Sequence, residues 1–254
     1  MHNLITMNID AWDTLLLNLP TKELLIMRET SKYFNNNICN CELSNKRIIK
    51  VKTKNINNLN KLNNNKGITN LFFDLQLFNN DGMVTNDCIK KLLNIVHLQL
   101  WDDYTITNDG IGRLINMTIL NLCGNEIITD NGINTLTNLT NLNLCNNEII
   151  TNDGIKSLTQ LKILNLCNNK TITNDGIKKL TNLMELSLRG NKMITNDGIK
   201  EHANITKLSL RDNNIITNDG IIGLTNLMEL DLQGNKIIND AILHKILPNI
   251  KIVK

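Results

Sequence analysis

Apolar and polar residues recur along most of this chain with a period of 22 residues. Each unit has three apolar columns, at its first, fourth and sixth positions, as in Leu139, Leu142 and Leu144. The alternation of Leu142 and Leu144 with polar residues is typical of a short strand with one apolar face. Because a single unit cannot bury its own leucines, neighbouring units must stack, and the pattern predicts a solenoid. The columns comprise Ile95, Met117, Leu139, Leu161, Leu183, Ile205 and Leu227; Leu98, Leu120, Leu142, Leu164, Leu186, Leu208 and Leu230; and Leu100, Leu122, Leu144, Leu166, Leu188, Leu210 and Leu232.

The second half of each unit predicts a turn and a short helix. Asn147 follows the strand, and an Asn side chain has the donors and the acceptor to satisfy turning backbone groups in its own and the neighbouring coil. In residues 151–155 we expect Asn or Asp at the helix N-cap, with Ile155 and Leu158 sharing one inward face. The glycine of this segment marks the period at Gly110, Gly132, Gly154, Gly176, Gly198 and Gly220.

The columns together give the pattern L-x-x-L-x-L-x-x-N, which resembles the leucine-rich repeat over about residues 66–254. The recurring Ile-Thr-Asn-Asp-Gly-Ile segment also resembles part of the repeats that accompany F-boxes. The resemblance implies an α/β solenoid with a curved parallel sheet on its concave face and short helices on its convex face. Parallel strands joined by crossing segments agree with the general rule for such sheets.

Regularity fades at both ends of the repeats, as the capping units of a solenoid require. We therefore divide them into a degenerate part (48–94), a regular part (95–235) and a C-terminal cap (236–254). Residues 68–80 fit a repeat with one inserted residue. Its bulky side chains are expected to close the core at that end: Phe72, Phe73 and Phe78.

Three further segments complete this outline. Residues 48–51 predict an earlier strand, and residues 250–253 predict one more strand at the far end. Between the two early strands, residues 53–67 are mostly Asn and Lys, which favours a loop or loose coil.

Residues 1–47 lack the repeat and predict a small helical element. Residues 11–19 read as an amphipathic helix that ends at Pro20, and a second helical run contains Leu24 and Leu25. From the residues alone, this is a group of two or three short helices.

The stretch from Leu15 to Phe34 resembles an F-box. It departs from the family pattern at the front, where residues 7–10 replace the family's L-P-x-E. In that family the F-box binds a Skp1-like adaptor, and the repeats hold a substrate for ubiquitin transfer by a cullin–RING ligase. The adaptor-facing residues implied by position are Leu15, Leu16, Leu19, Pro20, Leu24, Leu25 and Phe34. The alternative is that these helices only cap the first repeat and that the chain is a stand-alone interaction module.

A protein target is expected on the concave face, where the columns stop repeating. Glu185, Lys207 and Glu229 share one column with alternating sign, which predicts cross-strand pairing. Arg189 and Arg211 are like charges in adjacent coils, which favours them as ligands of an acidic partner. Trp101 occupies the column of Arg189 and Arg211 in the first regular coil, where it is a candidate anchor for an interface. The target-binding residues predicted are Trp101, Glu185, Arg189, Lys207 and Arg211.

The cysteines favour a reduced, intracellular protein. Cys123, Cys145 and Cys167 share one column and should stack about 5 Å apart along the concave face. Three small side chains in a packed ladder are the simpler interpretation, and a redox- or metal-sensing thiol row is the alternative. Neither spacing nor number indicates a disulfide or zinc framework among the six cysteines.

Composition excludes several other classes of function. A net charge of +3 is too small to predict nucleic-acid or membrane binding, and no apolar run predicts a signal peptide or a membrane span. The four histidines lack metal-ligand spacing, and no phosphate-binding loop is present, so we expect neither enzyme activity nor a cofactor. We expect a cytoplasmic or nuclear location. The abundance of Asn, Ile and Lys indicates an A/T-rich genome, such as that of a protist or a large virus of amoebae.

Overall fold

The computed structural model describes residues 47–52, 71–76, 85–90, 93, 95–101 and 103–254. All of the adaptor-binding residues predicted in the F-box-like segment, the loop over 53–67 and Phe78 lie outside these ranges. The division into an F-box-like segment and a repeat domain therefore stays a prediction. The repeats themselves are well covered.

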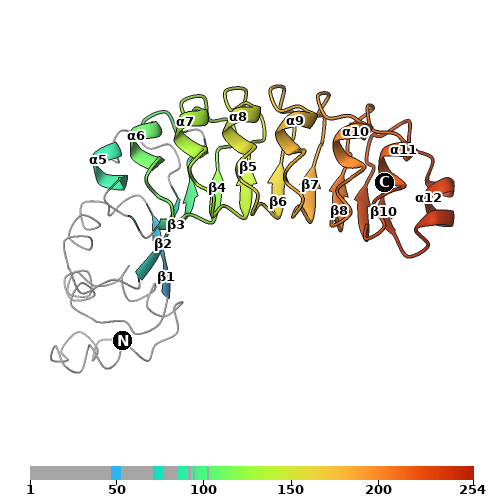
Figure 1. The fold of residues 1–254 in the computed structure, drawn as a ribbon, viewed down its shortest axis with the longest axis horizontal. Helices are drawn as coiled ribbons and strands as arrows, with labels where there is room; N and C mark the ends of the chain where they lie inside the picture. Colours follow the sequence, from blue (N-terminus) through green and yellow to red (C-terminus); the bar gives the residue numbers. More distant parts are fainter. Residues whose placement is uncertain (1–46, 53–70, 77–84, 91–92, 94, 102) are drawn as a thin grey trace.

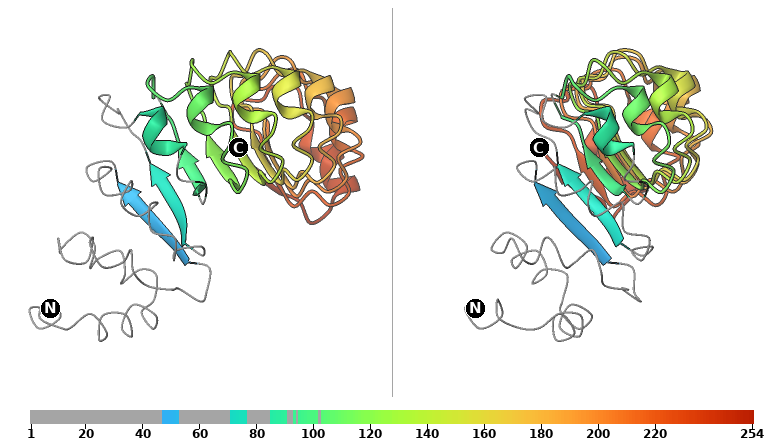
Figure 2. Two further views of the ribbon diagram at one scale, coloured as in Figure 1. Left: turned by 60° about the vertical axis from the view of Figure 1, so that its left-hand side comes forward. Right: turned by 90° about the vertical axis from the view of Figure 1, so that its left-hand side faces the viewer.

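The described strands form one parallel sheet of ten, in which the order across the sheet follows the order along the chain. Figure 1 shows an arc with the strands on its inner side and short helices on its outer side, and Figure 2 shows the coils stacked one behind another. The strands are β1 (Arg47–Lys52), β2 (Leu71–Gln76), β3 (Ile95–Gln99), β4 (Ile119–Asn121), β5 (Asn141–Asn143), β6 (Ile163–Asn165), β7 (Glu185–Ser187), β8 (Lys207–Ser209), β9 (Glu229–Asp231) and β10 (Lys251–Val253).

One helix lies in each described connection from β2 onwards. The helices are α5 (Asn86–Ile89), α6 (Asn108–Ile111), α7 (Asp130–Ile133), α8 (Asn152–Ile155), α9 (Asn174–Ile177), α10 (Asn196–Ile199), α11 (Asn218–Ile221) and α12 (Asp240–Ile246). The predicted sequence of strand, turn and short helix in each unit is confirmed, and so is the solenoid.

The leucine columns form a single core between the strands and the helices. Leu142 and Leu144 are fully buried, as are Ile155 and Leu158 on the opposite side of the same coil. In β4 to β7 and in β9 the middle residue is buried and the flanking residues are half-buried, so the flanking residues form the concave surface. Each coil contributes one layer to the core, and its neighbours complete it.

The asparagine that follows each strand from β4 to β9 connects adjacent coils. Asn147 donates from Nδ2 to the carbonyl oxygens of Leu122 (3.3 Å) and Asn125 (2.8 Å) in the preceding coil. Its Oδ1 accepts from the backbone N–H groups of Ile149 (3.1 Å) and Ile150 (2.9 Å) in its own coil. The same four contacts recur at Asn125, Asn169, Asn191, Asn213 and Asn235. The role predicted for this column is confirmed.

The N-cap is a threonine in α5 to α11, so the prediction of Asn or Asp at that position is wrong for these helices, while α12 has Asn239 as its N-cap. Thr151 precedes α8 in extended conformation, and its side chain accepts from the backbone N–H of Asp153. Asn152 instead reaches the next coil, where its Oδ1 accepts from the N–H of Thr173 (2.9 Å) and its Nδ2 donates to the Thr173 hydroxyl (2.9 Å). A side chain used between coils is not available to cap its own helix.

The position of the Asn152 side chain, which reaches into the next coil, explains the glycine of the repeat. A Cβ atom at Gly176 would collide with Oδ1 of Asn152 in the preceding coil and would touch Ile172 at 3.0 Å. The backbone at Gly176 is helical, so close approach, rather than an unusual φ, excludes a side chain there.

The strands predicted at both ends of the solenoid are present. β1 pairs with β2, and β10 pairs with β9. The register between β2 and β3 shifts after Phe73, because Phe73 pairs with Ile95 and Asp74 pairs with His97, so the unpaired residue is in β3 and the insertion predicted within residues 68–80 stays a prediction. β10 is short, which limits the exposed edge of the sheet.

Replacing Asn147 by alanine is expected to destabilise the solenoid strongly. The change removes four hydrogen bonds and leaves the Asn125 carbonyl oxygen and two N–H groups without these partners, while the Leu122 oxygen still accepts from the N–H of Asn125; we expect a cost of about 3–5 kcal/mol in the free energy of unfolding. Urea unfolding followed by circular dichroism measures this cost.

The matched control is Asn131→Ala, at an exposed helical position whose side chain makes no hydrogen bond within the described part of the chain. It should change the unfolding free energy by less than about 0.5 kcal/mol. Equal effects at the two positions would show that the hydrogen bonds of Asn147 do not contribute specifically to the stability of the solenoid.

Candidate functional site on the concave face

Three rows of side chains cross the concave face from coil to coil. The first row begins each strand from β4 onwards, the second ends each strand, and the third lies two residues after the second. The first row is His97, Ile119, Asn141, Ile163, Glu185, Lys207, Glu229 and Lys251; the second is Gln99, Asn121, Asn143, Asn165, Ser187, Ser209, Asp231 and Val253; the third is Trp101, Cys123, Cys145, Cys167, Arg189, Arg211 and Gln233. Strand register confirms that successive members of the first and second rows are neighbours.

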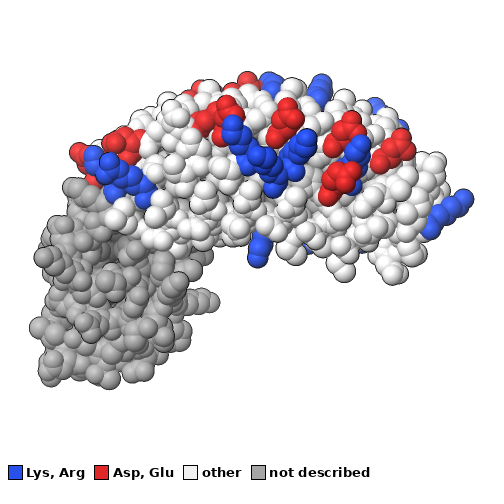
Figure 3. Space-filling model, viewed as in Figure 1, with Lys and Arg blue, Asp and Glu red and all other residues white. Residues whose placement is uncertain are grey.

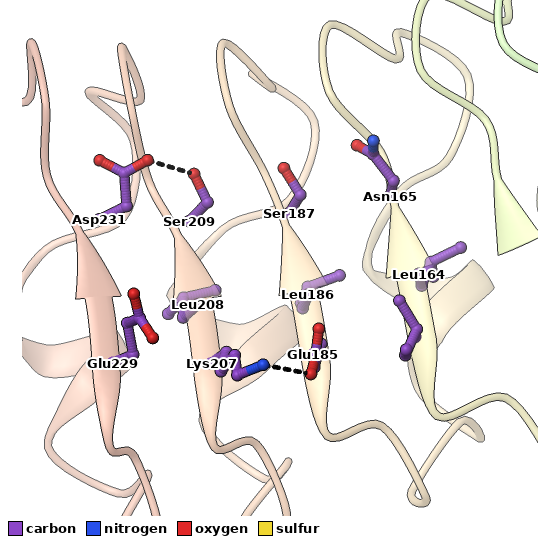
Figure 4. Close-up of a pocket in the computed structure, with 11 residues that line it drawn as sticks. Leu164, Asn165, Glu185, Leu186, Ser187, Lys207, Leu208, Ser209, Glu229 and Asp231 are labelled. Atoms are coloured by element: carbon purple, nitrogen blue, oxygen red, sulfur yellow. Dashed lines mark hydrogen bonds and ion pairs between the residues drawn. The ribbon is translucent and has the colours of Figure 1, made fainter. Parts of the chain in front are cut away.

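A hollow of about 420 Å³ lies over strands β6 to β9. Leu164, Leu186 and Leu208 form its floor, and each of them is at most 2% exposed. Figure 4 shows the charged residues Glu185, Lys207 and Glu229 on one side of this floor and the short polar residues Ser187, Ser209 and Asp231 on the other. The hollow therefore combines a flat apolar base with two polar margins.

The charged margin consists of two ion pairs between adjacent strands. Nζ of Lys207 lies 2.7 Å from Oε1 of Glu185, and Nζ of Lys251 lies 3.0 Å from Oε1 of Glu229. The hydrogen bond to Glu185 raises the pKa of Lys207. The predicted cross-strand pairing is confirmed for Glu185 and Lys207, while the described partner of Glu229 is Lys251.

The opposite margin holds a hydroxyl–carboxylate contact that sequence reasoning missed. The Ser209 hydroxyl donates to Oδ2 of Asp231 over 3.1 Å, while Oδ1 of Asp231 accepts from the backbone N–H of Gln233. Ser187, at the same position one strand earlier, has no hydrogen bond from its hydroxyl among the described residues. The second row supplied the signal, because its members change from Asn to Ser and then to Asp.

The two arginines of the third row share a counter-ion. Nε of Arg189 lies 3.5 Å and Nε of Arg211 lies 3.8 Å from Oδ2 of Asp212. Asp212 has φ of 54°, a left-handed turn that Gly190 and Asn168 adopt at the equivalent positions. Asp212 therefore offsets the repulsion between these two like charges, a contact that sequence reasoning missed. Their role in target binding stays a prediction.

Trp101 stands at the N-terminal end of the third row. Its side chain is 46% exposed, directly after β3 and away from the hollow over β6 to β9. The structure thus brings Glu185 and Lys207 into one hollow and Arg189 and Arg211 around one carboxylate, while Trp101 lies several coils away. The target-binding role of all five residues is untested.

The three cysteines of the third row form a thiol ladder. Each backbone N–H donates over 3.0 Å to the Oδ1 of the Asn two residues earlier, as from Cys145 to Asn143, and the Cys145 thiol interacts with those of Cys123 and Cys167 in the neighbouring coils. Burial raises the pKa of Cys145, and it raises the pKa of Cys167 to about 11. Because the thiolate is the reactive form, this ladder favours a packing role.

The described residues show neither a metal-binding cluster nor a helix that could span a membrane. Within the described ranges, no group of three or more His, Cys, Asp or Glu side chains could hold a metal ion. No helix in the same part of the chain has the length and apolarity required to cross a bilayer.

Comparisons with known proteins support the fold. A family model described as "Leucine Rich repeat" matches residues 179–201, 201–224 and 223–247. No curated protein matches the sequence. Among solved structures, a chain of the TLR13–ssRNA13 complex aligns with a TM-score of 0.61 and 20% identity, covering 90% of this chain and 34% of that one.

Two further structures show the same likeness. An internalin (inlF) from Listeria monocytogenes gives a TM-score of 0.52 and 18% identity, covering 89% of this chain and 77% of the internalin. The Toll–Spatzle complex from Drosophila gives 0.54 and 16%, covering 77% of this chain and 28% of the matched one. This chain spans about a third of the TLR13 chain. The fold is a leucine-rich-repeat solenoid.

The thiol ladder yields a test by pH. Because the folded state raises the pKa of Cys167 from 9.0 to about 11, its reaction with a disulfide reagent is expected to be slow at pH 7–9 and to accelerate up to about pH 11. The same thiol in the urea-unfolded chain should reach half of its maximal rate near pH 9. Stopped-flow absorbance measures both rates, with Cys167→Ser identifying the contribution of this residue.

A fast native reaction at pH 7 that disappears in Cys167→Ser would contradict the packing role and favour a reactive thiol row.

Proposed function

We propose that the chain is a protein-interaction module whose concave hollow over β6 to β9 holds a segment of a partner protein. The observation that carries this proposal is the hollow itself, where an apolar floor of three leucines lies between two different polar margins. A partner segment would pack over this floor, where each leucine is at most 2% exposed, and would be held chiefly where its polar groups meet the charges at the margins. The proposed role is binding rather than catalysis.

The charges define the partner segment further. Glu185 and Lys207 neutralise each other, so the charged margin fits a segment with both signs or with neutral hydrogen-bonding groups. The Ser187 hydroxyl and the Ser209–Asp231 pair offer donors and acceptors on the other side. A segment of apolar residues flanked by mixed polar ones matches this arrangement.

We further propose that the F-box-like segment links this module to ubiquitin transfer. In this reading the chain is the substrate-recognition adaptor of a Skp1–cullin–F-box ligase: residues 1–47 bind a Skp1-like adaptor and the solenoid holds the protein substrate. The sequence resemblance from Leu15 to Phe34 supports the proposal. The alternative is a stand-alone module with no link to ubiquitin, in which the N-terminal helices cap the first repeat.

The adaptor link is tested by replacing Leu24 and Leu25 together with aspartate. If these residues face a Skp1-like protein, the two carboxylates lose their water at the interface, and affinity is expected to fall at least about 100-fold. Isothermal titration of the full chain with a recombinant Skp1-like protein measures the affinity. Glu23→Gln, on the predicted polar face of the same helix, should leave it unchanged.

No binding by the full-length chain, or equal binding by the aspartate variant, would leave the stand-alone module as the function.

The concave site is tested by exchanging the charges of one ion pair. Glu185→Lys/Lys207→Glu keeps a pair of opposite charges but inverts its direction across the hollow. Proteins that co-purify with the full chain are expected to drop at least about tenfold. Quantitative mass spectrometry of the purified complexes gives the ratio.

The matched control inverts an ion pair on the convex side. Charged side chains gather there over the helices (Figure 3), and Lys156 pairs with Asp153 at 2.6 Å within one turn. Asp153→Lys/Lys156→Glu should recover the same proteins as the parent chain. Equal losses from both exchanges would place the partner outside the concave hollow.

A further inference from the structure

One flank of the solenoid, between each strand and the following helix, exposes an apolar row that stacking does not require. Each repeat has two consecutive apolar or small residues here, and only the second enters the core: Ile150 is fully buried, whereas Ile149 is 38% exposed. We call the exposed row the flank ridge; its members are Ile127, Ile149, Thr171, Met193, Ile215 and Ile237. The polar member, Thr171, shows that the fold accepts other residues at this position.

A row of charges runs beside the flank ridge, one residue earlier in each coil. This flank charge row is Glu126, Glu148, Lys170, Lys192, Asn214 and Lys236. Its sign changes once along the solenoid, from acidic to basic. Lys170 pairs with Glu148 at 2.6 Å, while Glu126 and Lys192 have no ion-pair partner among the described residues. Glu126 and Lys192, which are opposite in sign, thus lie one coil to either side of the Glu148–Lys170 pair.

This arrangement is self-complementary under two-fold symmetry. Consider an axis that crosses the flank from the convex to the concave side and passes between the coils of Glu148 and Lys170. Rotation about it reverses the direction of the solenoid and places each row against the same row of the second copy. Glu148 then faces Lys170 of the second copy, and Glu126 faces Lys192 of the second copy. Each facing pair occurs twice, as an isologous interface requires.

The shape of the molecule permits this packing. The arc curves in the plane of Figure 1, so rotation about that axis lays one arc over the other with the same curvature. The ridges also interlock, because Ile149 faces the small Thr171 of the second copy and Ile127 faces Met193. A hollow of about 590 Å³ beside Lys170 and Met193 leaves room for the incoming Ile149. Both concave faces remain open on the same side.

We infer that the chain forms an antiparallel homodimer through this flank. The partner is a second copy because charge row, ridge and curvature are all complementary to themselves. The inference does not depend on the proposed function, because the concave hollow takes no part in the contact.

The test uses two charge-reversed forms of the full chain. In Glu126→Lys/Glu148→Lys the four positions from Glu126 to Lys192 are all basic, and in Lys170→Glu/Lys192→Glu they are all acidic. Sedimentation equilibrium should show a dimer for the parent chain. Each variant alone should dissociate at least about 100-fold more readily, because like charges meet across the interface. An equimolar mixture should regain the parental affinity, since every facing pair is then opposite in sign.

A control variant carries the same change of net charge on the convex side. Asp153→Lys/Asp197→Lys alters two exposed helical residues and should dimerise like the parent. Circular dichroism confirms that each variant is folded. A parent chain that is monomeric at about 100 µM, variants that dimerise normally, or a mixture that stays monomeric would each overturn the inference.

Discussion

The structure depends on hydrogen bonds that pass from one coil to the next through asparagine side chains. Each coil of 22 residues must turn between its strand and its helix. The backbone of this turn has N–H and C=O groups that no helix or strand within the coil can satisfy. Asn147 meets this constraint with one amide, which donates to two carbonyls of the preceding coil and accepts from two N–H groups of its own. A carboxylate cannot donate, and a shorter hydroxyl cannot span both coils. In the first described coil Asp103 takes this place, where its Oδ1 accepts from the N–H groups of Thr105 and Ile106, the half of the role that a carboxylate can fill.

Stacking in this way has consequences for every other column. Because each coil repeats the previous one at the spacing of adjacent strands, any exposed position becomes a row of side chains about 5 Å apart. A row of identical charges would repel, and the concave rows avoid this by alternating sign, as between Glu185 and Lys207. Where two cations do meet, at Arg189 and Arg211, an aspartate from the adjoining turn lies between them. The surface chemistry of a solenoid is thus constrained by neighbours in the stack as well as by partners.

One core position departs from the repeat without an evident structural need. His202 replaces the leucine found at this place in Leu158, Leu180 and Leu224, and it is 3% exposed. Its Nδ1 has no hydrogen-bond partner within the described residues, and burial lowers the pKa of the ring. The ring is therefore held neutral more strongly than in water, and the stability it contributes is lost as the pH falls through its lowered pKa. Leucine would fill the same space without this dependence on pH.

The sequence by itself determined the repeat, its three-part unit, the solenoid and the strands at both ends, because a period of 22 residues admits one way to bury its leucines. It also indicated the pairing of Glu185 with Lys207, since residues one period apart must be neighbours. What it could not show were contacts between different columns. Thr151 rather than Asn152 caps its helix, Gly176 lies against an asparagine side chain, and Asp212 neutralises two arginines. Such contacts depend on the offset between neighbouring coils and on the direction of each turn, and only the tertiary structure decides these.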